Sequence, residues 1–428
     1  MDKRNKLWLA LALIGIIGGV VGIVLTRLMH FVQHHAFRYA LHGEALSFRE
    51  GVEAAPPALR VSVLVLCGVL AGSGWWLLNR YGRELTDAKQ ALERPLEGLP
   101  FWKTLAHSAL QIITVGMGSP LGREVAPREA AAAFATVCAR KIGLDEQGAR
   151  LLTACAAGAG LAAGYNVPLA STLFVLEAML GVWTRQAVAA ALLTTVLATA
   201  VAWAGLGDFR QYIPSYTVSQ FEINHTLLYW SVAAGPLLGA AAAAFRRSIR
   251  PLPLVARGGG YAVWAAAAAF ALIGLLSIRY PDILGNGKAG NQLVFGGMIG
   301  WTDSLELFAA KWLAIILALA AGAYGGLITP SMMLGSTLAY AAAMLWNMFL
   351  PAAPEESAAV VGAAVFLGLS LNMPLTALVF ILDLTRAPIS LLMPLCACMA
   401  GAVMTAEWLE NQAARRGGEN NMQGTPRV

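Results

Sequence analysis

Six consecutive residues, Gly122 to Pro127, read GREVAP and place two opposite charges between two backbone breakers in an apolar part of the chain. Charged side chains are costly in hydrocarbon and persist there mainly where they face a cavity or a partner, so Glu124 is the first candidate functional residue. Pro127 precedes an Ala-rich run and marks a helix N-terminus, where free amides and the positive end of the helix dipole attract anions. The alternative is that Arg123 and Glu124 form an ion pair in a loop at the membrane surface.

The composition indicates the class of protein. Of the 428 residues, 58% are hydrophobic and only 13% are charged, whereas soluble domains carry about 25% charged residues. The chain is therefore predicted to be an all-α polytopic membrane protein. Several apolar runs are short or are interrupted by Gly and Pro. The runs that are long enough to cross a bilayer begin near Leu7, Leu59, Ala187, Leu227, Tyr261 and Ala309.

The formal net charge of +6 could indicate an acidic partner, but the basic residues cluster at the ends of the apolar runs. They lie at the N-terminus, at Arg246 to Arg250, and at Arg415 and Arg416. The positive-inside rule places such ends in the cytoplasm, so both termini are expected there. The lipid bilayer is therefore an expected partner, and nucleic acid is not.

Motifs for catalysis or metal binding are absent from the sequence. It has no HExxH motif, and around Ser73 the two glycine positions of a GxSxG motif hold Ala71 and Trp75. The only close cysteine pair, Cys396 and Cys398, has no metal-ligating neighbours. We therefore expect neither enzymatic activity nor a cofactor nor a bound metal.

Two parts of the chain repeat each other. The segment 161–169 aligns with 367–375 through a shared Asn-x-Pro-Leu, and the same register pairs Glu177 with Asp383. The alternative is chance similarity between segments rich in Ala and Leu. The repeat divides the chain into a first membrane half at 1–206, a linker at 207–225, a second membrane half at 226–408 and a polar cytoplasmic tail at 409–428.

The backbone breakers of the GREVAP segment also recur in the second half. With a shift of three residues, Gly122 pairs with Gly325 and Pro127 pairs with Pro330. Repeated short spans that are interrupted by Gly and Pro indicate a transport site near the membrane midplane, where helix N-termini from the two halves converge. The residues that shape the two breaks are Gly122, Arg123, Pro127, Gly325, Gly326 and Pro330.

The residues that follow these breaks predict the chemistry of the site. Val125 and Ala126 in one half, and Leu327 and Ile328 in the other, would direct free backbone amides toward one spot. Such amides bind an anion without a full positive charge that would trap it. Glu124 would compete for the same amides, occupying the spot when ionised and leaving it when protonated. Gating by pH or exchange with protons is therefore physically accessible.

These residues resemble the signature motifs of the CLC family of chloride channels and proton-coupled anion exchangers, and the resemblance covers nearly the whole membrane part of the chain. The family's G(K/R)EGP motif is similar to Gly122 to Pro127, with Val125 and Ala126 where the family usually has one Gly. Its GxFxP motif is similar to Gly326 to Pro330, with Ile328 in place of the Phe.

The resemblance implies a CLC-like inverted repeat of two related helical halves with broken and short helices, assembled as a homodimer with one pore per subunit. It implies that Glu124 is the gating glutamate, that the amides of Leu327 and Ile328 bind the anion, and that the protein lies in the inner (plasma) membrane of a bacterium. The expected function is passive or proton-coupled transport of a small inorganic anion, with chloride as the first expectation.

Two departures from the family pattern keep alternatives open. The family's GSGIP serine would fall near Gly82 to Thr86, where this chain reads GRELT. Many exchangers carry an acidic pair in the helix that matches 169–180, and the second residue of the pair relays protons. Here Glu177 is followed by Ala178, which leaves Glu177 as the candidate proton residue. Fluoride/proton exchange, transport without protons, and a structural homologue that does not transport are the alternatives.

Overall fold

The structure is a computed structural model that describes residues 3–39, 47–81, 84–208, 211–212, 224–250, 252 and 261–423. These residues form sixteen α-helices and several single-turn helices. The only β pairing among them is an isolated bridge between Gly122 and Gly326. The all-α prediction is therefore confirmed. The predicted linker at 207–225 lies mostly outside the described residues, as do Gly82 and Arg83.

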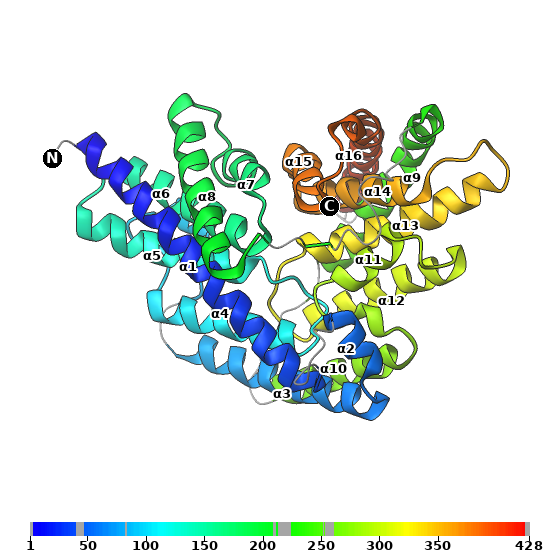
Figure 1. Ribbon diagram of the computed structural model, residues 1–428, viewed down its shortest axis with the longest axis horizontal. Coiled ribbons are helices and arrows are strands. Elements are labelled where there is room, and N and C mark those ends of the chain that lie inside the picture. Colours follow the sequence, from blue (N-terminus) through cyan, green and yellow to red (C-terminus); the bar gives the residue numbers. More distant parts are fainter. Residues whose placement is uncertain are drawn as a thin grey trace.

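The helices fall into two consecutive groups, and Figure 1 shows most of each group in its own arm of the molecule. The first group contains α1 (Lys3–Phe37), α2 (Phe48–Ala54), α3 (Pro57–Arg80), η1 (Gln90–Leu92), α4 (Phe101–Gly116), α5 (Val125–Ile142), α6 (Glu146–Tyr165), α7 (Pro168–Phe174), η2 (Val175–Leu180) and α8 (Arg185–Leu206). The second contains α9 (His225–Ile249), α10 (Tyr261–Arg279), η6 (Pro281–Ile283), α11 (Lys288–Phe295), α12 (Trp301–Ala320), α13 (Ile328–Asn347), α14 (Glu355–Leu371), α15 (Pro374–Thr385), η7 (Ile389–Leu391) and α16 (Leu392–Gln423).

Seven helical segments of the described chain are long and apolar enough to cross a membrane. Five of them contain the runs predicted from Leu7, Leu59, Ala187, Leu227 and Tyr261, and the other two are Ile328–Asn347 and Ile389–Ala413. The run predicted from Ala309 lies in α12, which carries Asp303, Glu306 and Lys311 and is not one of the seven. A bilayer-spanning protein built from full and broken helices agrees with the predicted class.

The sequence repeat is confirmed as a repeat of backbone conformation. Helix α6 ends at Asn166 with a φ of 61°, and α14 ends at Asn372 with a φ of 53°. Asn tolerates this left-handed conformation better than other residues with side chains, which explains why the repeated motif has Asn at the helix end. Pro168 and Pro374 then occupy the first helical positions of α7 and α15, where the missing N–H costs nothing.

Two helices extend beyond the apolar runs that they contain. The apolar run 151–164 lies within α6, which has 20 residues. It begins earlier because the Asp145 side chain accepts a hydrogen bond from the Gly148 amide and caps a polar first turn. Likewise, α16 continues past Trp408 to Gln423, so the polar tail begins as a helical extension.

The two halves join along α3 and α10, which lie side by side at the bottom of Figure 1. Glycines permit this close approach. A Cβ on Gly68 would lie 2.6 Å from the Ala266 carbonyl oxygen, and one on Gly72 would lie 2.8 Å from the Val263 Cα. Small residues are the usual means by which membrane helices bring their backbones together. The α3/α10 seam therefore fixes one half against the other.

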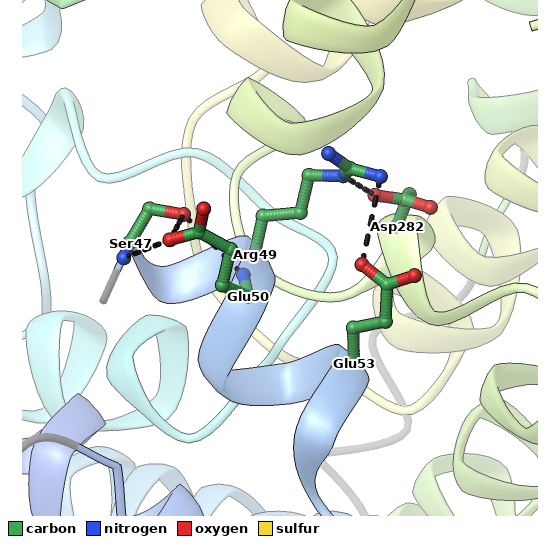
Figure 2. Close-up of polar contacts among 5 residues, drawn as sticks. All are labelled: Ser47, Arg49, Glu50, Glu53 and Asp282. Atoms are coloured by element: carbon green, nitrogen blue, oxygen red, sulfur yellow. Dashed lines mark hydrogen bonds and ion pairs between the residues drawn. The ribbon is translucent and has the colours of Figure 1, made fainter. Parts of the chain in front are cut away.

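A polar clamp also links the halves, as Figure 2 shows. Arg49 on α2 extends its guanidinium to Asp282 in η6, with Nε 2.9 Å from the carboxylate, and it also lies 3.5 Å from Glu53. Helix α2 begins with a capping box between Ser47 and Glu50. The loop that follows η6 donates an amide to Gly118, just before the GREVAP segment. The clamp thus supports the loop on which that segment rests.

We expect the two partners of the clamp to differ in their effect on stability. Burial raises the pKa of Asp282, and Arg49 offsets this only in part. A raised carboxyl pKa means that Asp282 ionises less readily in the folded protein than in the unfolded chain. The free energy of unfolding therefore decreases as the pH rises through the folded-state pKa. Asp282→Asn should therefore leave the melting temperature in detergent unchanged or raise it, most clearly at pH 8. Arg49→Ala leaves the Asp282 carboxylate without its partner and should lower the free energy of unfolding by about 1 kcal/mol.

The control for this comparison is Glu53→Gln, because the Glu53 side chain is 60% exposed and a surface ion pair contributes little. Equal losses of stability in Arg49→Ala and Asp282→Asn would contradict the prediction.

Candidate functional site

The two repeated breaks meet in the structure. The Gly122 amide donates to the Gly326 carbonyl at 2.7 Å, and the Gly326 amide donates back at 2.8 Å. These paired loops lead directly into α5 and α13, so the N-termini of the two helices face one small region. Both glycines are needed there, because a Cβ on either would lie within 2.2 Å of a Glu124 carboxylate oxygen.

Glu124 fills the space between the two helix starts. Its side chain is fully buried. One carboxylate oxygen accepts the Ile328 amide at the start of α13, and the other accepts the Tyr165 hydroxyl at 3.0 Å. Glu124 is the N-cap residue of α5 but does not cap its own helix with its side chain. The carboxylate therefore occupies, on α13, the kind of position that binds anions at helix N-termini.

Arg123 does not pair with this carboxylate. Its guanidinium donates to the Gly164 carbonyl at 2.9 Å and to the Gln211 side chain at 3.4 Å, and it lies over the Tyr165 ring at 5.0 Å. Both Arg123 and Glu124 are buried. The alternative of an exposed loop ion pair is therefore wrong, and the full positive charge of Arg123 is directed away from the carboxylate.

The predicted amide donors lie around this point. Val125 and Ala126 form the start of α5, Leu327 is the N-cap of α13, and Ile328 is its first residue. Among the described contacts, Glu124 takes the amide of Ile328. Because the Glu124 side chain leaves the first turn of α5 uncapped, this helix retains donors for a second acceptor.

Helix packing sets the position of the first turn of α5. A Cβ on Gly160 of α6 would lie 2.1 Å from the Pro127 carbonyl oxygen, so the two backbones touch at the motif proline. On the other side, a Cβ on Gly325 would lie 2.5 Å from the Leu121 Cβ. The start of α13, including Pro330, is buried. The motif residues thus hold two helix N-termini close together.

Glu177, the candidate proton residue, contacts the opposite half of the molecule. Its two carboxylate oxygens accept the amides of Leu375 and Thr376, at 3.0 and 2.6 Å, and the Thr376 hydroxyl at 2.6 Å. It therefore caps α15 in the opposite half. Asp383, its counterpart in the repeat, accepts the Ala170 amide of α7 at 3.3 Å. Each acid thus accepts amides at the start of a helix in the opposite half. The described contacts of Glu177 do not include Glu124.

Tyr165 is a site residue that the motifs did not indicate. Its hydroxyl joins Glu124 to Thr329 Oγ1, which lies 2.9 Å away. The repeat contained a signal for it, because Tyr165 aligns with Leu371 in the matching segments. A polar hydroxyl where the equivalent position of the other half is apolar is the sequence signal that points to Tyr165.

Comparison with known proteins agrees with this geometry. The family described as "Voltage gated chloride channel" matches residues 65–407. A "Putative chloride channel protein ClcB-like" of Ralstonia nicotianae is 29% identical, covering 79% of this chain and 80% of that protein. An "H(+)/Cl(-) exchange transporter ClcA" of Citrobacter koseri is 26% identical, covering 95% and 87%.

Solved structures match the fold. A slow cyanobacterial Cl⁻/H⁺ antiporter superposes with a TM-score of 0.80 at 19% identity, over 94% of this chain and 95% of that one. A CLC-type fluoride/proton antiporter superposes with a TM-score of 0.72 at 18% identity, over 94% and 96%. The two similar folds thus belong to proteins described as transporting different halides.

Proposed function

Because the chain belongs to the CLC family of voltage-gated chloride channels and related transporters, we propose that its CLC-type anion transport uses a pathway gated by Glu124, with chloride as the transported anion. The observation that carries the proposal is the position of the Glu124 carboxylate. It accepts the first amide of α13 in a fully buried site formed by both halves. A negatively charged side chain therefore occupies the place where a small anion would be bound.

The proposed mechanism follows from this competition. The ionised carboxylate is held by the Ile328 amide and the Tyr165 hydroxyl and closes the site. Protonation removes its charge, weakens both hydrogen bonds and lets the side chain leave. The freed amides of α13 and of the first turn of α5 then bind the anion. Alternation between a protonated, displaced Glu124 and an ionised, inserted one couples anion movement to proton movement.

Placement in the membrane is a further part of the proposal. The basic residues at the start of α1 and the pair Arg246 and Arg247 at the end of α9 support an orientation with both termini in the cytoplasm. The similarity to bacterial proteins supports a location in a bacterial inner membrane. The homodimer implied by the family resemblance stays a prediction. Crosslinking in the native membrane would test it.

The experiment that tests the proposed function is paired recording of anion and proton movement from liposomes that contain the purified protein. Chloride-loaded vesicles should release chloride and take up protons in a fixed ratio. Chloride release without proton movement would contradict the proposed proton coupling and indicate that the protein is a channel. Vesicles loaded with fluoride test the alternative anion, and faster coupled fluoride release than chloride release would overturn the choice of chloride. No anion release would contradict transport itself.

Tyr165→Phe should loosen the gate without abolishing coupling. The substitution removes one of the two described hydrogen bonds that hold the carboxylate, and a bond to a charged group contributes about 1.5–3 kcal/mol. We therefore expect anion release to increase by about tenfold or more, with the proton-to-anion ratio preserved. Tyr340→Phe is the matched control, because Tyr340 is a buried tyrosine of α13 without a described contact to Glu124. Unchanged release in Tyr165→Phe would contradict the role of the hydroxyl.

A further inference from the structure

A second buried acid lies on the same helix as Glu124. Glu129 on α5 is 6% exposed, and its carboxylate lies 3.4 Å from Nε2 of His107, a residue of α4 that is 3% exposed. The indole of Trp75 on α3 donates to Nδ1 of the same ring at 3.0 Å. The ring also meets Tyr324 edge to face at 5.0 Å. Helices α3, α4 and α5, together with Tyr324, thus enclose the pair formed by His107 and Glu129.

The Trp75 hydrogen bond settles the protonation of His107. An indole N–H can only donate, so Nδ1 accepts and the imidazole is neutral with its proton on Nε2. The amide of Gln111 lies 2.6 Å from Nε2, and its oxygen has no other partner among the described residues. With the amide oxygen turned toward the ring, Nε2–H is satisfied and Gln111 gains a partner. His107 cannot take a second proton without losing the hydrogen bond from Trp75.

Glu129 is therefore the member of this cluster that can gain and lose a proton. It has one weak polar contact, at 3.4 Å, whereas Glu177 accepts three hydrogen bonds from α15. The charged groups that act on Glu129 are Arg128 on α5 and Asp87 in the segment between α3 and α4. Asp87 is exposed, so the surroundings of Glu129 extend toward solvent.

From this geometry, and resting on the proton coupling proposed above, we propose that Glu129 is the internal proton-binding residue that exchanges protons with Glu124. The two acids are five residues apart on α5, a rise of about 7.5 Å, and Arg128 acts electrostatically on both of them. The O–H bond of Glu129 breaks, and an O–H bond forms on Glu124 through intervening water. Glu129 is then reprotonated from the side of Asp87. His107 positions the carboxyl group and supplies no net charge.

Glu129→Gln tests this assignment in the full-length protein in liposomes. The amide keeps the shape of the side chain, but it cannot carry a proton. We expect proton movement to fall at least tenfold relative to anion movement while anion release persists. Glu146→Gln, an exposed glutamate in the first turn of α6, is the matched control and should keep the wild-type ratio.

The possible outcomes separate this inference from the proposed function. If the wild type moves anions but no protons, both the coupling and the role of Glu129 are overturned. If the wild type is coupled and Glu129→Gln keeps the full ratio, only the role of Glu129 is overturned. Loss of coupling in Glu177→Gln, with coupling retained in Glu129→Gln, would place the relay at Glu177 instead.

Trp75→Phe provides a second arm in case Glu129→Gln does not fold. Without the indole donor, His107 can become an imidazolium that holds Glu129 ionised. The proton-to-anion ratio should then fall severalfold, and the loss should grow as the pH is lowered, because a lower pH favours the imidazolium. A purely structural role for the cluster would change the yield or thermal stability and leave the ratio unchanged, and an unchanged ratio in folded Trp75→Phe would overturn the inference.

Discussion

Glu124→Ala is expected to reduce proton movement to background while anion release continues and increases at least about tenfold. The carboxylate fills a fully buried site and holds the Ile328 amide. Hydrogen bonds to a charged group contribute about 1.5–3 kcal/mol each, so removing the side chain removes a strong competitor for the anion. The same substitution deletes the group that carries the proton.

The pH dependence of anion release provides the matching measurement. In the wild type, release should increase as the pH falls, because protonation frees the carboxylate from its donors. Release from Glu124→Ala vesicles should not depend on pH over the same range. Glu124→Gln serves as the shape control: it also loses proton movement, but its amide can still accept the Ile328 N–H, so its anion release should be slower than that of the alanine variant.

Loss of anion release in both Glu124 variants, with folded protein shown by size-exclusion chromatography, would contradict the gate. In that case the buried carboxylate would be a structural cap of α13 rather than a displaceable competitor.

Local chemistry made the breaks of the fold predictable from the sequence. Asn before x-Pro stops a helix and starts the next one, and the structure shows this at Asn166 and at Asn372. Gly and Pro likewise determine where α5 and α13 begin. Since the breakers recur in order, the convergence of the two helix starts could also be predicted, and the bridge between Gly122 and Gly326 shows it.

Contacts between distant segments could not be read in the same way. Glu177 caps α15, which lies about 200 residues away in the chain, and nothing in its neighbouring sequence indicates that partner. His107 and Lys311 lie at nearly equal distances before the two breaks, but they differ in chemistry. His107 packs against Glu129, whereas buried Lys311 donates to the carbonyls of Ile283 and Gly285. Tertiary surroundings, rather than spacing, decide such roles.

Gly160→Ala should reduce anion release at least about tenfold although the substitution lies outside the motifs. The added Cβ would lie 2.1 Å from the Pro127 carbonyl oxygen and 2.9 Å from the Arg128 nitrogen. Both are backbone atoms, so no side-chain rotation relieves the overlap, and α5 must move away from α6 by about 1 Å to reach ordinary contact. That movement carries the first turn of α5 away from α13. At a preorganised site, a displacement of about 1 Å can reduce a rate about 10²-fold.

Gly164→Ala is a closely matched control because it makes the same chemical change one helical turn later. Its Cβ would meet only the Pro127 side chain, at 3.6 Å, which is ordinary van der Waals contact. We therefore expect normal anion release from Gly164→Ala and at least a tenfold loss from Gly160→Ala, in liposomes with equal amounts of folded protein. Equal release from the two variants would show that the anion site tolerates displacement of α5, and that the amides of α13 alone are sufficient to bind the anion.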